Sequence, residues 1–362
     1  MKILRFVVTL FTLTTFSQTA SADLVSQAQY VSLVQALTEK TALPLHRQFA
    51  IEAALMGDVM KGFCAAPTPA GQVEVTQRFH ALMDAWQQVE PFRFGPVMTA
   101  PGPARFQFWP DKRGTGQRQL RQAFKDKDVT LTEGTTLATK SVALRDLQAL
   151  ETLIFVKPEV LLEPGSYRCA YASAIADLQR TQAALLYDTW SRPNGFAAEL
   201  INAASSTPAF FDEREAAGAY VNALVSTLEV IRLQKLDRPM GLTVSEARTS
   251  RLENWRSKRS TQNMVLNLLT LQRFFAVEGG FSDLLRRVDK QEDATAAEAL
   301  FDKVIYNLQA FESPMETLVA DTKARSNLES LLNDLRALQT LIQEKIAIDL
   351  GLVPGFNATD GD

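Results

Sequence analysis

A glutamate lies on the apolar face of a helix predicted over residues 141–155, SVALRDLQALETLIF. Four positions at helical spacing define that face within an arc of about 120°: Leu144, Leu147, Leu150 and Ile154. Glu151 projects inside this arc, and Gln148 lies at its edge, one turn earlier on the same side. A carboxylate that helix packing carries into a core needs a partner, a cation or a proton. Glu151 is therefore the strongest pointer to a site, although it does not name the chemistry.

A second group of polar residues extends an apolar stripe in residues 245–275, which are predicted to form one continuous helix. The stripe consists of Met264, Leu268, Leu271 and Phe275. Extended backward, the same face carries Ser260, Ser257 and Glu253, with Asn267 at its margin. A helix has this pattern when its first turns border a polar cavity or another domain.

Two arrangements of Glu253 stay open. In the first, Glu253 lines such a cavity. In the second, it caps the helix or pairs with Arg251, Arg256 or Arg259 at an interface, an interaction that is common and weak at surfaces. Arg256 is also a suitable counter-charge for a carboxylate or an anionic ligand.

The motifs of common catalytic sites are missing from the sequence, namely HExxH, GxSxG, the phosphate-binding GxxxxGK motif and GxGxxG after a strand. The two histidines, His46 and His80, belong to separate predicted helices, and we expect each at the surface or at a boundary. A zinc site would need both histidines and a carboxylate from a third helix. Carboxylates alone can hold iron or calcium. Asp146 and Glu151, however, point about 140° apart on a helix, so another helix would have to contribute.

The chain has two cysteines, Cys64 in GFCAAPTP and Cys169 in GSYRCAYA. Two thiols cannot make a closed zinc site. Without a redox motif, and in an oxidising compartment, we expect them to form a structural disulfide. This bridge would join the end of one helix to the helix that begins near Tyr167.

Almost every segment of the chain shows the three- and four-residue spacing of helices. The predicted helices are residues 24–40, 45–63, 72–89, 117–124, 136–155, 167–190, 196–204, 212–236, 245–275, 294–311 and 314–350. No pair of alternating β-branched runs flanks a tight turn, so no sheet is expected. The sequence therefore predicts an all-α fold of two up-and-down helical bundles, with domains at 23–192 and 193–362.

Residues 90–116 form the longest irregular stretch and hold five of the 15 prolines. The stretch also contains Phe92, Phe94, Phe106, Phe108 and Trp109. Flexible linkers are polar and rich in glycine and serine, which this stretch is not. We expect it to pack against a bundle, either as an aromatic lid on the bundle end or as the wall of a cleft.

Residues 1–22 have the features of a secretory signal, with Lys2 and Arg5 before an apolar run and Ala20-Ser21-Ala22 as the cleavage site. The run is too short to span a membrane, and no later stretch reaches about 18 consecutive apolar residues. Without this segment, 36 basic and 41 acidic residues remain, a net charge of −5. Such a balance does not suit nucleic acid. We expect a periplasmic protein without a transmembrane segment.

Several stretches of the sequence resemble the imelysin family of exported bacterial proteins. They are Cys64 at the end of an early helix, FQFWPDKRG, SVALRDLQALETLIF, the helix of Cys169, LENWRSKRS and the C-terminal GFNATDGD. The family is catalogued as peptidases and is often tied to iron supply. The resemblance implies an all-helical, two-domain fold with a site near the domain junction. It also implies that the C-terminal segment is ordered, with Asn357 and Asp360 near that site.

The family motif Gly-x-His-x-x-Glu matches this sequence only at its last position. Asp146 stands for the glycine, Gln148 for the histidine and Glu151 for the glutamate. Glutamine cannot act as a general base and is a poor metal ligand beside imidazole. This departure weakens a metallopeptidase interpretation.

Three functions follow as hypotheses. The first is a periplasmic protein of iron or metal acquisition that binds a ligand, or an envelope protein partner, at the domain junction without catalysis. Its ligand would be a small molecule or a metal such as iron or another divalent ion. The candidate ligand-binding residues are Asp146, Gln148, Glu151, Glu253, Arg256 and Ser257. The alternatives are a metallopeptidase and a purely structural adaptor.

Overall fold

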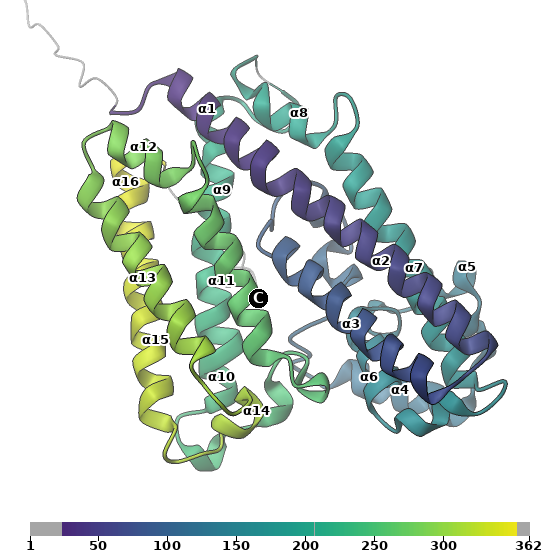
Figure 1. Ribbon diagram of the computed structural model, residues 1–362. Helices are drawn as coiled ribbons and strands as arrows, with labels where there is room; N and C mark the ends of the chain where they lie inside the picture. Colours follow the sequence, from purple (N-terminus) through teal and green to yellow (C-terminus); the bar gives the residue numbers. More distant parts are fainter. Residues whose placement is uncertain (1–23, 206, 353–362) are drawn as a thin grey trace, which may run out of the picture.

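All regular structure in residues 24–205 and 207–352, which the computed structural model describes, is helical. Figure 1 shows two groups of helices side by side. The first helix group contains α2 (Leu43–Ala65), α3 (Pro69–Val89), α4 (Thr115–Asp126), α5 (Gly134–Leu137), α6 (Leu147–Phe155) and α7 (Tyr167–Ser191). The second contains α9 (Glu213–Glu229), α10 (Arg238–Met240), α11 (Ser260–Ala276), α12 (Phe281–Arg287), α13 (Gln291–Gln309), α14 (Met315–Leu318), α15 (Arg325–Thr340) and α16 (Ala347–Asp349). The predicted all-α fold is confirmed.

One long helix passes from the second group into the first. α1 (Gln27–Leu37) continues through the π-helical segment Thr38–Ala42 into α2, although two separate helices were predicted. α1 packs against α9, whereas α2 packs against α3 and α7. Pro44 has no N–H for a helical hydrogen bond, and the wider π-helical turn immediately precedes it.

The predicted helix at residues 245–275 is wrong in its first half. α11 begins only at Ser260, after short 3₁₀ turns that include Trp255–Ser257. Asn254 and Lys258 take left-handed backbone angles, with φ of 49° and 56°, which a continuous right-handed helix excludes. The polar residues before α11 are therefore carried by a folded loop, and this loop lies at the junction of the two helix groups.

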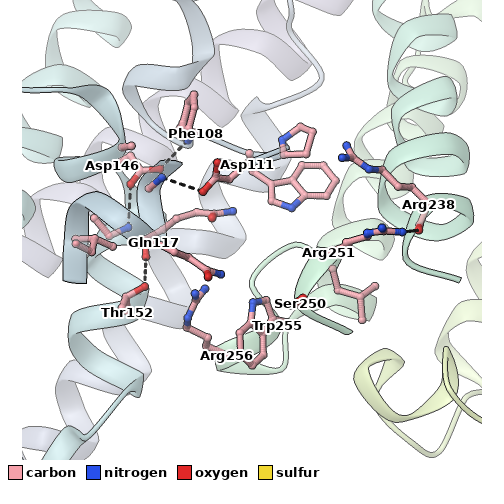
Figure 2. A pocket seen from close by; sticks show the side chains of 18 residues that line it. Phe108, Asp111, Gln117, Asp146, Thr152, Arg238, Ser250, Arg251, Trp255 and Arg256 are labelled. Carbon is pink, nitrogen blue, oxygen red and sulfur yellow. Dashed lines mark hydrogen bonds between the residues drawn. The ribbon is translucent and has the colours of Figure 1, made fainter. Parts of the chain in front are cut away.

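The predicted helix at residues 136–155 is also interrupted. Asp146 is the N-cap of α6, and its Oδ1 accepts a hydrogen bond from the backbone N–H of Ala149 at 2.8 Å. Its Oδ2 accepts another from the N–H of Phe108 at 2.6 Å, which ties the aromatic loop to the helix start (Figure 2). An acidic N-cap satisfies otherwise unpaired N–H groups, so the break has a local cause.

The aromatic loop of residues 90–116 packs into the core, as predicted. Phe92 and Phe106 are fully buried. The Phe106 ring lies 4.9 Å from that of Trp86 on α3, while the Phe92 ring lies 5.1 Å from that of Phe274 on α11. The loop therefore contacts both helix groups.

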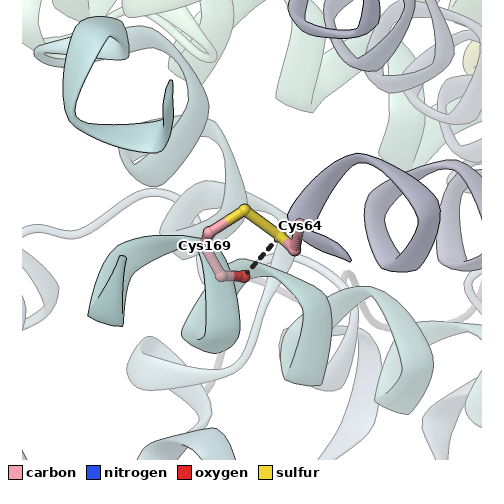
Figure 3. Close-up of a disulfide and its surroundings, with 2 residues drawn as sticks. All are labelled: Cys64 and Cys169. Atoms are coloured by element: carbon pink, nitrogen blue, oxygen red, sulfur yellow. Dashed lines mark hydrogen bonds between the residues drawn. A yellow bond between two sulfur atoms is a disulfide. The ribbon is translucent and has the colours of Figure 1, made fainter. Parts of the chain in front are cut away.

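The predicted disulfide is present between Cys64 at the end of α2 and Cys169 in the first turn of α7 (Figure 3). The two Cα atoms are 5.6 Å apart, and 105 residues separate them in sequence. The bridge joins the far ends of two helices that pack along each other.

α8 (Phe196–Ile201) begins directly after the SRPNG segment, at which α7 ends. The hydrophobic core is continuous across both groups, so the division into domains at 23–192 and 193–362 stays a prediction. No helix in the described ranges has the length and apolar character of a membrane span. The signal segment 1–22 and the GFNATDGD segment, with Asn357 and Asp360, lie outside the described residues.

Candidate functional site

Glu151 is fully buried on α6, as its helical position predicted. Its Oε1 accepts hydrogen bonds from the N–H of Ser257 at 3.0 Å and from the Ser257 hydroxyl at 2.6 Å. The Arg256 guanidinium is its nearest cation, with Nη1 3.8 Å from Oε2. Burial raises the pKa of Glu151, and Ser257 and Arg256 oppose that rise. The structure thus brings together three predicted site residues from opposite sides of the junction.

Asp146 faces a small cavity at the start of α6. Burial raises its pKa to about 7, against the lowering effect of backbone N–H groups that include those of Phe108 and Ala149. We name this space, of about 80 Å³, the α6 cavity, and Gln148 and Arg256 also line it. Figure 2 shows Arg238 and Arg251 across it, coming from the second helix group.

Glu253 forms a different site with Lys235, which the sequence interpretation missed. Its Oε2 lies 2.8 Å from the Lys235 ammonium, and that ammonium lies 2.7 Å from Oε2 of Glu90. The side chains of Lys235 and Glu253 are 2% and 1% exposed. Of the two arrangements left open for Glu253, the structure does not have the pairing with Arg251, Arg256 or Arg259, because Lys235 on the π-helical segment Val230–Asp237 reaches the carboxylate instead.

Amide side chains complete this junction network. Gln87 and Asn267 each accept a hydrogen bond from Lys235, at 2.9 and 2.7 Å. Gln107 and Asn263 donate to the Glu253 carboxylate at 3.0 and 2.9 Å. The junction network consists of Gln87, Glu90, Gln107, Lys235, Glu253, Asn254, Asn263 and Asn267. Because its members come from both helix groups, the network joins them.

Two carboxylates share one ammonium in this network. Burial raises the pKa of Glu253, with Lys235 opposing and Glu90 adding to the rise. Burial alone would raise the pKa of Glu90 as well, but Lys235 and Arg93 together lower it to about 2. The arrangement favours a charged Glu90 and disfavours charge on Glu253.

A larger cavity of about 700 Å³ opens beside the network, and we name it the junction cavity. Glu90, Gln107 and Glu253 contribute to its lining, together with the cationic residues Arg93, Lys112 and Arg113. The segment from Phe108 to Asp111 lines both this cavity and the α6 cavity. Of the six candidate residues, Asp146, Gln148 and Arg256 line the α6 cavity and Glu253 lines the junction cavity. Glu151 and Ser257 are buried and line neither.

The missed residues carry the same signal that identified Glu151. Lys235 follows Ile231 by four residues and Glu90 follows Trp86 by four, and both reference residues are buried. A charged residue that extends an apolar stripe in this way is a candidate for a buried charge. The other residues of these two helices follow the usual amphipathic pattern, so Lys235 and Glu90 do not stand out in the sequence.

Neither histidine supports a metal centre. His46 was expected at the surface or at a boundary, but it is 1% exposed, and its ring lies 4.4 Å from that of Trp190. Burial lowers its pKa to about 4. His80 is half-buried and its Nδ1 lies 3.0 Å from Arg259. Among the described residues no three histidine, cysteine, aspartate or glutamate side chains converge on a point where an ion could bind.

Comparisons with known proteins agree with this architecture. The Imelysin family model matches residues 42–342. A curated relative, iron-regulated protein A of Synechococcus elongatus, is 20% identical over 325 residues, covering 86% of this chain and 85% of its own.

Two solved structures are similar to this fold. An imelysin-like protein from Psychrobacter arcticum has a TM-score of 0.78 at 17% identity, covering 92% of this chain and 98% of its own. A putative iron-regulated protein A precursor from Parabacteroides distasonis has a TM-score of 0.76 at 14% identity, covering 90% and 97%. The family match extends over most of the sequence and includes both sides of the junction. This chain belongs to the imelysin family.

Proposed function

We propose that this protein is an exported binding protein of iron supply that holds a chelated iron in the junction cavity without cutting a bond. The observation that carries the proposal is a buried charged network beside a cavity of about 700 Å³, at the junction of two helix groups. Small-molecule sites have volumes of about 300–1,000 Å³ and often lie between domains. The name of the Synechococcus relative supports the link to iron.

The donors near the cavity favour a chelate over a bare ion. Glu90 and Glu253 are both paired with Lys235, and Glu151 accepts from Ser257. A metal ion would have to displace these partners before a carboxylate could coordinate it. A chelate brings its own ligands to the iron and needs only recognition of its surface.

The cationic lining favours a chelate with negative charge. Arg93, Lys112 and Arg113 line the junction cavity, and Arg93 is already paired with Glu90 at 2.9 Å. Arg113 is therefore the guanidinium that we propose binds a carboxylate of the ligand through paired hydrogen bonds. Ferric complexes of small carboxylic acids have this chemistry. The network below the cavity holds the wall in place, because its groups are buried and hydrogen bonded.

Our proposal that no bond is cut rests on Gln148, which stands where the family motif has a histidine. An amide cannot take a proton from a water molecule at neutral pH. We therefore propose binding rather than peptide hydrolysis as the task of this junction.

Titration calorimetry of the mature protein with ferric citrate tests the proposal. We expect saturable binding, and stabilisation by about 2.7 kcal/mol at a ligand concentration 100 times the Kd. Arg113→Glu should weaken binding at least tenfold. Gln234→Trp should also weaken it, because Gln234 lines the cavity and an indole would fill it. Arg47→Glu is the matched control, because Arg47 is exposed on α2, away from the cavity.

Two results would overturn the proposal. One is the absence of binding to ferric citrate, or binding that Arg113→Glu leaves unchanged. The other is cleavage of an unfolded protein that stops on addition of a chelator and in the variant Glu151→Gln, which would establish the metallopeptidase alternative. Citrate without iron serves as the reference for recognition of the ligand alone.

A further inference from the structure

A third cavity, of about 450 Å³, adjoins the α6 cavity at Arg256, which lines both. We name it the α4–α6 pocket, because residues of both helices and of the start of α7 line it. Five cationic side chains contribute to the lining: Arg121, Lys127, Lys157, Arg168 and Arg256. Glu163 is its acidic residue. The whole chain has a net charge of −3, so this local excess of positive charge runs against the composition.

Ordinary structural roles account for some of these cations but not for all of them. Arg168 donates to the backbone oxygens of Thr152 and Leu153 at 3.0 and 3.2 Å, where α6 ends. Lys127 and Lys157 follow the ends of α4 and α6, where a positive charge complements the helix dipole. Within residues 24–205 and 207–352, however, neither ammonium has a carboxylate within ion-pair distance, and the same holds for Arg121.

A buried hydroxyl supplies an independent sign of a missing ligand. Ser166 is the N-cap residue of α7 and lines the pocket. It is only 8% exposed, yet its Oγ has no hydrogen-bond partner in the described structure and does not cap the helix. A buried polar group without a partner is unfavourable, and a bound oxygen acceptor would give the hydroxyl a partner.

The remaining walls are apolar. Leu120 and Phe124 of α4 face the pocket, as do Val156, Val160 and the ring of Tyr167. The guanidinium of Arg168 lies over the Phe124 ring at 4.8 Å, which joins the cationic and apolar parts of the lining. Such a surface matches a molecule with one charged end and an apolar body.

We propose that the α4–α6 pocket binds an amphipathic organic anion, whose carboxylate or phosphate group contacts the lysines and Ser166 while its body lies on Phe124 and Val156. This site is separate from the junction cavity, and its occupation does not depend on the function proposed above. Arg256 lines both the pocket and the α6 cavity, so a bound anion would lie close to the Glu151 partner.

Titration calorimetry with three ligands of equal chain length tests this proposal: decanoate, decyl phosphate and decanol, each below its aggregation limit. We expect one or both anions to bind with a stoichiometry of one, and decanol to bind at least tenfold more weakly. A comparison of the two anions identifies the preferred head group. Binding should weaken as salt is added, because the lysines are solvent-accessible.

Variants locate the binding. The double substitution Lys127→Glu and Lys157→Glu should weaken anion binding at least tenfold, whereas Lys157→Arg should retain it. Arg121→Glu is a second test on a regular helical position, should the double variant fold poorly. Lys125→Glu is the control, since Lys125 is exposed on α4 and does not line the pocket. Equal binding of decanol, no binding of either anion, or affinities that both charge reversals leave unchanged would overturn the proposal.

Discussion

Two buried glutamates lie at the same junction, and their surroundings differ. Glu253 has an ammonium at 2.8 Å and amide donors on both oxygens. Glu151 has one oxygen hydrogen bonded to Ser257, while its Oε2 has no hydrogen bond and its cation is 3.8 Å away. Burial raises the pKa of both. Both oxygens of Glu253 are paired, although the amide nitrogen of Asn254 and the amide oxygen of Asn263 in the same network have no hydrogen bond in the described structure. Glu151 has capacity for another partner on Oε2.

This difference suggests that Glu253 has a structural role, whereas Glu151 can change its protonation state or its partner. A network whose buried charges are paired is expensive to break, because removing one charged member leaves the others buried and unpaired. An incompletely paired carboxylate can change its proton or its partner with little rearrangement. We therefore expect the network to decide the stability of the junction and Glu151 to respond to conditions.

The largest effect is expected from Lys235→Met. The substitution leaves Glu90 and Glu253 buried without their common cation, and breaking a buried ion pair costs about 3–5 kcal/mol. Urea unfolding at pH 7 measures the loss. Lys303→Met is the control, because Lys303 is 55% exposed in its pair with Asp334. This substitution should lower the free energy of unfolding by less than about 1 kcal/mol. Equal effects of the two substitutions would remove the distinction between network and surface pairs.

His46 provides a reference for burial without a partner charge. Its folded-state pKa of about 4 lies below the ordinary 6.5, so the stability due to the neutral ring is present above pH 6.5 and is lost as the pH falls toward 4. The loss should reach about 3 kcal/mol. Denaturant unfolding of the wild type and of His46→Leu between pH 7 and 4 measures it. The same pH slope in both proteins would contradict the expectation.

Glu151→Leu should have an intermediate effect. Replacing a buried charge by a hydrophobe is often neutral or favourable, so burial alone would predict a folded protein that is no less stable. The structure changes this expectation, because the buried N–H of Ser257 loses its acceptor at a cost of about 1–3 kcal/mol. Thermal unfolding compares Glu151→Leu with Glu151→Gln, which keeps an acceptor oxygen. A Leu variant as stable as the Gln variant would show that these hydrogen bonds contribute little.

The smallest effect is a pH dependence at Glu151. Its pKa is raised by burial, so the wild type loses stability as the pH rises through the folded-state pKa, whereas Glu151→Gln has no such group. The free energy of unfolding of the Gln variant, relative to that of the wild type, should therefore be greater at pH 7.5 than at pH 4.5. Paired unfolding curves at the two pH values measure it. If the Gln variant were instead more favoured over the wild type at pH 4.5 than at pH 7.5, this would mean that Arg256 keeps the Glu151 carboxylate charged.

The sequence predicted the features that local patterns determine. Helical periodicity indicated the all-α fold and the burial of Glu151, and the cysteine count indicated the bridge. Glu253 and Ser257 were placed at the junction for an incorrect reason, because a continuous helix was assumed where Asn254 and Lys258 break it. Local spacing could not show which distant cation reaches Glu253, since Lys235 comes from a π-helical turn. Pairing of this kind depends on tertiary packing.

The helix formed by α1 and α2 limits how the junction can open. Tyr30 donates to the oxygen of Leu350 at 2.6 Å, and Thr38 is hydrogen bonded to Tyr220 at 2.8 Å, while the same helix ends at the disulfide of the other group. Separation of the groups would require this single rod to bend, and the segment Thr38–Ala42 has the least regular backbone hydrogen bonds in it. The two helix groups should therefore keep their mutual orientation when a ligand enters the junction cavity.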